Sequence, residues 1–257
     1  MTFDVQSVLA GARALGLSIS EQQGEQLVAF GKLLMQWNRV YNLTRIESEE
    51  AVLNLHILDS LAFVAAIAHR HPTTALDVGS GGGLPAIPLA VVRPDVQITM
   101  VDSVQKKTVF LQQVIMKLDL TNAHVVHSRI EDLSSKRVHA VTCRAFATLS
   151  KTVALTRRFL ADDGVWLLMK GKDPVEEFDA LDSDIRVEEN RKLIIPGSNL
   201  NRCLIVLRVN QARESLVRGE TNTSVLVKTR EKPLKINALR SKKSAKNKGE
   251  TCWDLKR

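Results

Sequence analysis

The chain has 257 residues, 44% of them hydrophobic, which is enough for one substantial buried core. No apolar run reaches the roughly 18 residues that a membrane span requires. Asp4 and Arg13 interrupt the first apolar segment, so we expect neither a membrane partner nor a signal peptide. The three cysteines lie far apart and form no CxxC pair, which disfavours a disulfide framework and a zinc site. We therefore expect a cytoplasmic, metal-free protein, and a monomer.

The net charge of +8 is confined to one end of the chain. Residues 211–257 contain 13 Lys and Arg against 5 Asp and Glu, whereas residues 1–210 contain 23 of each kind. The basic segment is short of apolar residues and has no sustained periodicity, which predicts a disordered tail. Such a tail either binds a polyanion such as RNA or only aids solubility.

Residues 1–70 are predicted to form an N-terminal helical region. Ser20 and Gln23 make a capping box, and apolar residues then recur at helical spacing through residues 27–41. A second helix is predicted over residues 49–67, because two glutamates suit its positive first turn and a proline follows its end.

Residues 71–210 alternate short apolar runs with helical segments, which predicts an α/β domain. Such βαβ alternation is typical of a mainly parallel sheet with helices on both faces, here with the possibility of an antiparallel edge. The predicted strands are Ala75–Val78, Gln97–Val101, His124–His127, Ala140–Cys143, Val165–Met169 and Leu204–Val209. The predicted helices are Pro85–Val92, Gln105–Leu118, Ser150–Leu160 and Pro174–Leu181.

A glycine-rich loop follows the first of these strands, where open α/β sheets bind ligands. Its pattern is DxGxGxG, from Asp77 through Gly79 and Gly81 to Gly83. A dinucleotide fingerprint, GxGxxG, would need a glycine at Leu84. The alternative is that the glycines only form a tight strand-to-helix turn and bind no ligand. Four glycines in five positions are more than such a turn requires.

The charges around this loop favour S-adenosylmethionine over a dinucleotide. The Asp77 carboxylate would repel a pyrophosphate, but it would attract the sulfonium and ammonium groups of S-adenosylmethionine. Asp102 ends the next strand, where an acidic residue accepts hydrogen bonds from ribose hydroxyls. The segment Ser128–Asp132 follows the third strand and is positioned to frame an adenine.

Several motifs, in order, resemble those of the bacterial 16S rRNA guanine-N7 methyltransferases of the glucose-inhibited division protein B type. They are WNRVYNLT, HILDSL, DVGSGGGLPAIPLAVVRP, VDSVQKKTVFL, SRIEDL, CRAFATL and LLMKG. The resemblance covers roughly residues 30–209. It implies a Rossmann-like class I methyltransferase fold with an N-terminal helical cap, S-adenosylmethionine as the cofactor, and 16S rRNA or the small-subunit particle as the partner.

Carried over by motif, the resemblance implies that Gly79, Leu84, Ile130, Glu131 and Arg144 are cofactor-site positions. Two departures stand out. Ala86 replaces a glycine that is usual in the family, and the basic tail has no counterpart in typical members.

Methylation at guanine N7 needs no general base, because N7 already presents a lone pair in the plane of the ring. Three residues are candidates for the reaction itself. Arg144 could contact the cofactor, the guanine edge or a phosphate, and we favour O6 or phosphate because a bond to N7 would block the attack. Lys170 is a candidate for a substrate phosphate, and Asn42 either reaches into the cleft or caps a helix.

His56 lies on the apolar face of a predicted helix, and we interpret it as a core histidine. Asp59 and Ser60 on the same helix are expected either to hydrogen-bond to His56 or to face solvent.

Two other functional classes remain open from the sequence. An NAD-dependent oxidoreductase could use the same sheet, although Leu84 and Asp77 disfavour it. A non-catalytic RNA-binding protein could use the basic tail alone, but this would leave the glycine loop and Asp102 without a role.

Overall fold

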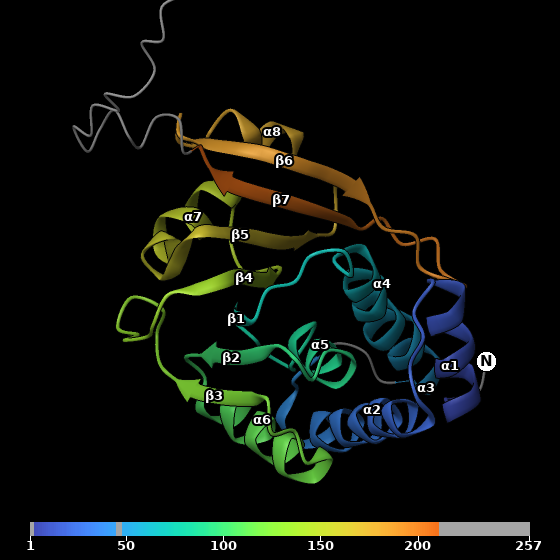
Figure 1. Cartoon of the computed structure of the whole chain (residues 1–257). Coiled ribbons are helices and arrows are strands. Elements are labelled where there is room, and N and C mark those ends of the chain that lie inside the picture. The colour runs from blue at the N-terminus through green and yellow to red at the C-terminus, as the bar shows by residue number, and fades with distance from the viewer. Residues whose placement is uncertain (1–2, 45–47, 211–257) are drawn as a thin grey trace, which may run out of the picture. The chain divides into compact units, whose positions relative to one another are not determined.

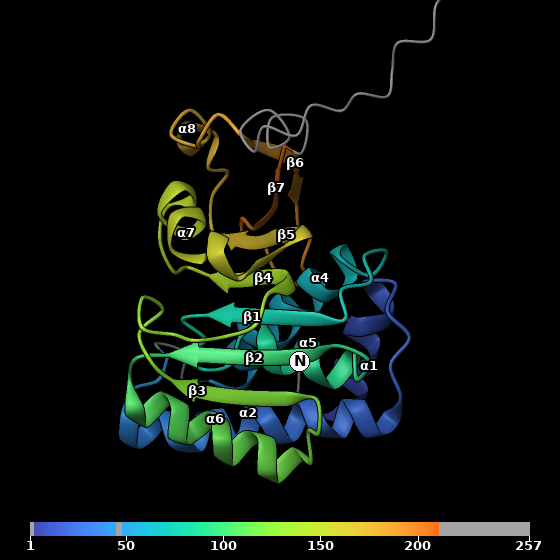
Figure 2. The ribbon, with the colours of Figure 1, turned by 60° about the vertical axis from the view of Figure 1, so that its left-hand side comes forward.

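A computed structural model describes residues 3–44 and 48–210 of the chain. The predicted basic tail lies outside the described residues. Seven strands form one sheet in the order β3-β2-β1-β4-β5-β7-β6 (Figures 1 and 2). Strands β1 to β5 are parallel to one another, and β7 runs antiparallel to both β5 and β6. The predicted α/β fold with an antiparallel edge is thus confirmed.

The strands are β1 (Thr74–Val78), β2 (Gln97–Asp102), β3 (Ala123–His127), β4 (Val138–Arg144), β5 (Leu160–Lys170), β6 (Ile185–Lys192) and β7 (Cys203–Val209). Helices α1 (Val5–Ala14), α2 (Glu21–Tyr41), α3 (Glu49–Val52) and α4 (Asp59–Ala66) precede the sheet. Helices α5 (Ala86–Val92), α6 (Gln105–Leu118), α7 (Leu149–Thr156) and α8 (Val175–Phe178) lie between strands. Within the described residues, no helix is both long and apolar enough to cross a membrane.

Local side-chain hydrogen bonds determine where helix α2 begins. The Ser20–Gln23 capping box is present, with Ser20 Oγ accepting from the Gln23 amide at 3.1 Å and Gln23 Oε1 accepting from the Ser20 amide at 2.9 Å. Gln23 Nε2 also donates to the carbonyl of Val91 at 2.8 Å, which ties the start of α2 to the end of α5. The second predicted helix contains a π-helical turn, Leu53–Leu58, between α3 and α4, and such turns often occur at functional sites.

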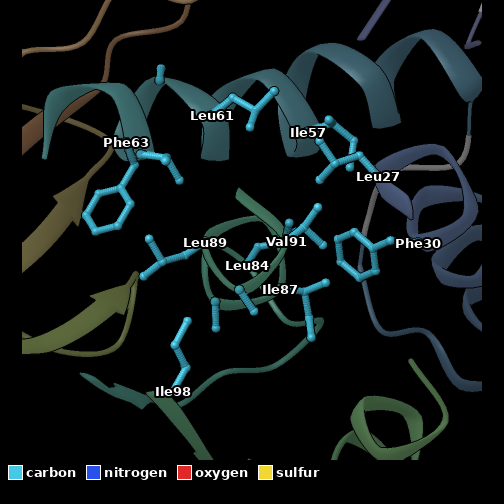
Figure 3. Packing of buried hydrophobic residues seen from close by; sticks show 14 of the residues in the cluster. Leu27, Phe30, Ile57, Leu61, Phe63, Leu84, Ile87, Leu89, Val91 and Ile98 are labelled. Carbon is cyan, nitrogen blue, oxygen red and sulfur yellow. The ribbon is translucent and has the colours of Figure 1, made fainter. Parts of the chain in front are cut away.

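Side chains that alternate along the strands divide the core between the two faces of the sheet. Along β5, Val165, Leu167 and Met169 join the cluster that includes α1, α2, α4, α5 and α6, whereas Trp166 and Leu168 join the cluster that includes α7. Figure 3 shows the first cluster, in which side chains from α2, α4 and α5 meet over the sheet. The N-terminal helices therefore share a hydrophobic core with the sheet.

Several parts of the sequence-based assignment differ from the structure, including the helix predicted over Pro174–Leu181, which is only Val175–Phe178. Strand β6 was missed because most of its side chains are charged and exposed, as is common in an edge strand. The helix predicted over Ser150–Leu160 ends at Thr156, after which a 3-10 turn, Arg157–Phe159, leads directly into β5. The helix after the glycine loop begins at Ala86, one residue later than predicted.

The fold of the glycine loop depends on the glycine at position 83. Gly83 has φ +83°, and a Cβ there would lie 2.7 Å from Ile87 Cγ1 and 2.8 Å from Leu111 Cδ2. We expect Gly83→Ala to lower the free energy of unfolding by roughly 2–4 kcal/mol, since left-handed backbone strain and overpacking add. Gly82→Ala is the matched control, because a Cβ there meets only Leu34 Cδ1 at 3.3 Å. Urea unfolding of both variants measures the difference, and equal unfolding midpoints would contradict the expectation.

Candidate functional site

Charged side chains of opposite sign occupy different strands at the carboxyl edge of the sheet. Asp77 and Asp102 lie at the ends of β1 and β2, whereas Arg144 and Lys170 end β4 and β5. Because these four strands are parallel, the four residues belong to the same edge. Open α/β sheets bind their ligands at this edge.

A cleft of about 400 Å³ opens at this edge, next to the ends of β1 and β2. Its size falls within the roughly 300–1,000 Å³ that is usual for small-molecule sites. Four of the predicted cofactor residues line it, namely Gly79, Asp102, Ile130 and Glu131, and residues 145–147 add to its wall. We call it the glycine-loop cleft.

Asp102 organises the turn beside this cleft. Its Oδ2 accepts a hydrogen bond from the Gly81 amide, and its Oδ1 accepts one from the Val104 amide, both at 2.9 Å. Lys107 Nζ lies 3.9 Å from Oδ2. A carboxylate has about four acceptor positions. Asp102 can therefore hold the turn and still accept from ribose hydroxyls.

Asp77 lies beneath the cleft rather than on its wall. The residue is 1% exposed, and its Oδ1 accepts a hydrogen bond from Thr142 Oγ1 at 2.8 Å. Its Oδ2 is buried and has no hydrogen-bond partner in the described part of the chain. Burial raises the pKa of Asp77 to about 6, although the hydroxyl groups of Ser80 and Thr142 act in the opposite direction. Such an unsatisfied buried oxygen is costly, and the next residues along the chain, Val78 and Gly79, line the cleft.

The glycines and Leu84 divide into two groups by location. Gly79 has φ +66° and lines the cleft, and a Cβ there would lie 2.8 Å from Phe146 Cδ2. Gly81 has φ +57°, a Cβ there would be in ordinary contact with the carbonyl oxygen of Gly79 at 3.7 Å, and the residue is not among those that line the cleft. Gly83 and Leu84 instead face the core, as shown for Leu84 in Figure 3. They shape the turn and are not among the residues that line the cleft.

Arg144 belongs to a buried ion cluster centred on Asp59. The Asp59 side chain is fully buried; its Oδ2 accepts from Arg144 Nη1 and its Oδ1 accepts from Arg202 Nε, both at 2.9 Å. Both expectations for Asp59, a bond to His56 or exposure to solvent, were therefore wrong, as was exposure of Ser60, which is fully buried. The expectations failed because the partners of Asp59 are brought to it by the tertiary fold: the two arginines lie 85 and 143 residues further along the chain.

His56 is a satisfied core histidine, as the sequence predicted. Its Nδ1 donates to the carbonyl of Leu55 at 2.9 Å, and its Nε2 then accepts from Thr44 Oγ1 at 2.8 Å. Burial, reinforced by the charge of Arg144, lowers the pKa of His56 to about 4. The ring is therefore neutral at pH 7 and has both nitrogens engaged.

Lys170, which the sequence suggested as a contact for a substrate phosphate, has its ammonium group engaged within the protein, and the phosphate contact stays a prediction. Its Nζ donates to the carbonyl of Ala147 at 2.9 Å and lies 3.0 Å from each carboxylate oxygen of Glu177. These partners use the three donors of an ammonium group. Glu177 Oε2 also accepts from the amide of Leu149. Lys170 and Glu177 together fix the segment after β4 that lines the glycine-loop cleft.

Asn42 caps α2, which was one of the two predicted alternatives. It adopts a left-handed conformation with φ 50°, and its amide donates to the carbonyl of Asn38. Asn38 in turn accepts from the amide of Thr44 through Oδ1 at 2.7 Å. Lys106 Nζ, in the first turn of α6, donates to the carbonyl of Tyr41 and so holds this cap near the carboxyl edge. A contact of Asn42 with substrate stays a prediction.

Two residues stand out among those of the cleft wall that sequence reasoning missed. Ala145 has φ 54°, an uncommon conformation for a residue with a Cβ, and strain of this kind is often found at functional sites. Phe146 packs over Gly79 and lines the cleft. The motif CRAFATL contains both residues, but nothing in it reveals the left-handed backbone or the direction of the ring.

Comparison with known proteins places this geometry in a family. The model of the family described as "GidB: rRNA small subunit methyltransferase G" matches residues 23–206. Ribosomal RNA small subunit methyltransferase G of Leptothrix cholodnii is 45% identical over 215 residues, which cover 82% of this chain and 99% of that protein. The protein of the same name from Neisseria meningitidis serogroup C is 46% identical over 199 residues, covering 77% and 95%.

Among solved structures, a SAM dependent methyltransferase from Aquifex aeolicus aligns with a TM-score of 0.47 at 16% identity, over 62% of this chain and 93% of that chain. A likeness at this level is too weak to assign a function. The family match and the identities of the two relatives are decisive instead. The chain therefore belongs to the GidB family, rRNA small subunit methyltransferase G.

Proposed function

We propose that the protein transfers a methyl group from S-adenosylmethionine to N7 of a guanine in the 16S rRNA of the small ribosomal subunit. The observation that carries this proposal is the unsatisfied Oδ2 of Asp77 beneath a cleft lined by Gly79 and Asp102. Family membership supports the same reaction, since the relatives are named as rRNA methyltransferases.

The residues of the glycine-loop cleft suit this cofactor. Asp102 accepts from the ribose, Ile130 and Glu131 flank the adenine, and an ammonium group at the Gly79 end gives Asp77 Oδ2 the donor that it lacks. When bound, the cofactor supplies a methyl group attached to a positively charged sulfur. The negative charges of Asp77 and Asp102 favour this cation and disfavour the pyrophosphate of a dinucleotide.

The surrounding side chains favour N7 over other positions of attack. Burial raises the pKa of Cys143 to about 12, so that its thiol is protonated and unsuited to nucleophilic attack on a pyrimidine carbon. His56 has no free nitrogen with which to act as a base. Guanine N7 needs neither group, because its lone pair attacks directly and the enzyme has only to align the reactants. Arg144, held by Asp59, lies at the same edge and can bind O6 or a phosphate.

Methyl transfer from labelled S-adenosylmethionine to small-subunit RNA tests the proposal, with the modified base identified by mass spectrometry. The RNA is supplied both as naked 16S rRNA and as small-subunit particles. We expect label on guanine N7 with at least one of the two substrates. Label on another base, or nicotinamide dinucleotide binding without any methyl transfer, would overturn the proposal.

The affinity for S-adenosylmethionine is expected to depend on pH through Asp77. The pKa of about 6 belongs to the free protein, and a cationic ligand binds the ionised carboxylate more tightly. The affinity for S-adenosylmethionine should therefore be nearly constant from pH 7.5 to 6.5 and should fall by up to about tenfold per pH unit below pH 6. Calorimetric titration measures it, and Asp77→Asn should show a weak, flat profile. An affinity in the wild type that holds or rises between pH 6.5 and 5 would contradict this assignment.

A further inference from the structure

A second cleft lies at the same carboxyl edge, beyond the end of β5. Its volume is about 440 Å³, and its lining includes Lys172, Lys192 and Arg202. The strand register brings these segments together, because Lys170 on β5 faces Cys203 on β7, which in turn faces Lys192 on β6. We call it the basic cleft.

The basic cleft has an excess of positive charge. Its three cations share the lining with one carboxylate, Asp173, and Oδ1 of that residue already accepts a hydrogen bond from Asn190 Nδ2 at 2.9 Å. Lys172 and Lys192 are exposed, and neither forms an ion pair within residues 3–44 and 48–210. Unpaired ammonium groups gathered in one cleft favour an anionic ligand.

Arg202 is held in a fixed orientation on one side of this cleft. Its Nε donates to the fully buried Asp59 at 2.9 Å, and its Nη1 donates to the carbonyl of Asn201 at 3.0 Å. A guanidinium has five N–H donors, so these bonds leave three for a ligand. The other oxygen of Asp59 binds Arg144. One buried carboxylate therefore couples the basic cleft to the end of β4.

From these contacts we propose that the basic cleft binds a backbone phosphate of the substrate RNA through Lys172, Lys192 and Arg202. The inference rests on the proposed function for the identity of the substrate. A phosphate suits a guanidinium held in a fixed plane and two mobile ammonium groups. No aromatic side chain is among the described lining residues, so the cleft offers no platform for stacking a base. The glycine-loop cleft for the cofactor and the basic cleft for RNA then divide the carboxyl edge between them.

The double variant Lys172→Ala/Lys192→Ala of the full chain tests this proposal. Its matched control is Lys117→Ala/Lys136→Ala. Those two exposed lysines lie just before β3 and β4, at the opposite edge of the sheet. We expect the first variant to raise KM for RNA about tenfold, the cost of one lost specific contact, with kcat and the Kd for S-adenosylmethionine unchanged. The slope of log KM against log salt should fall by about 0.7–0.9, as for one phosphate contact. The control should change neither the KM for RNA nor the slope of log KM against log salt.

Equal effects of the two double variants would overturn the site, since they would indicate a diffuse electrostatic attraction. An unchanged KM in the first variant would overturn it too. A changed Kd for S-adenosylmethionine would point to a cofactor-side role instead and contradict the assignment. RNA binding measured by fluorescence anisotropy applies the same comparison without catalysis, so failure of the phosphate site can be distinguished from failure of the proposed methyl transfer.

Discussion

Replacing Asp77 by Asn is expected to stabilise the free protein and to abolish tight binding of S-adenosylmethionine. The folded state holds the Asp77 carboxyl at a pKa of about 6 in place of 3.8. The ionised form therefore costs the folded state up to about 3 kcal/mol at neutral pH. Asparagine removes this charge and retains an acceptor for Thr142. It also removes the negative charge that attracts a cationic cofactor.

The sign of the stability effect depends on pH in a defined way. As the pH falls from about 6 towards 4, the folded wild type takes up a proton before the unfolded chain does, so its stability rises. We therefore expect the stability gap between Asp77→Asn and the wild type to be widest above pH 7 and to narrow towards pH 4.

Urea unfolding with and without S-adenosylmethionine measures both effects of this substitution. The cofactor should raise the unfolding midpoint of the wild type and leave that of Asp77→Asn almost unchanged. Asp119→Asn is the control, because Asp119 is exposed at the far end of α6 in a left-handed conformation that asparagine also favours. An Asp77→Asn protein that is less stable than the wild type at pH 7.5, or that binds the cofactor normally, would contradict this role.

Removal of Asp59 is expected to produce a large loss of stability. In Asp59→Ala, Arg144 and Arg202 lose their shared carboxylate while their side chains remain only 22% exposed. Breaking a buried ion pair typically costs about 3–5 kcal/mol. Because these arginines retain some solvent, we expect roughly 2–4 kcal/mol, and a large loss of methyl transfer with it.

The matched control for Asp59 is the exposed ion pair between Arg137 and Asp162. Asp162→Ala should change stability far less, because exposed ion pairs contribute little. Asp59→Asn keeps hydrogen-bond acceptance and should fall between the wild type and Asp59→Ala. If Asp59→Ala and Asp162→Ala unfold at the same denaturant concentration, the ion cluster is not what holds the two arginines.

Local pattern was sufficient to predict the parts of the fold that periodicity and capping determine. Ser20 and Gln23 identify the start of α2, and apolar runs predict the six strands other than β6. Most side chains of these strands are buried on both faces, except in the edge strand β3, where only Val125 is buried. Strand β6 has no apolar face to reveal it. Its pairing with β7 depends on backbone hydrogen bonds that any sequence can make.

The sequence predicted those site residues that lie in single loops at strand ends, but not the contacts between residues distant in the chain. Gly79 and Asp102 follow consecutive strands, so sequence order alone places them in one cleft. The pairing of Asp59 with Arg202 joins residues 143 positions apart and has no local signal. Lys170 was assigned from its position at a strand end, and the sequence could not reveal that Glu177 and the carbonyl of Ala147 occupy its ammonium group.

A crystal structure with S-adenosylhomocysteine tests most directly whether the carboxyl edge is divided between cofactor and RNA. We expect the ligand in the glycine-loop cleft, with its ribose on Asp102 and its amino group within hydrogen-bond distance of Asp77 Oδ2. The basic cleft around Lys172 and Arg202 should remain free of it. Binding in the basic cleft, or binding in the glycine-loop cleft with no ligand atom near Asp77 Oδ2, would contradict this division.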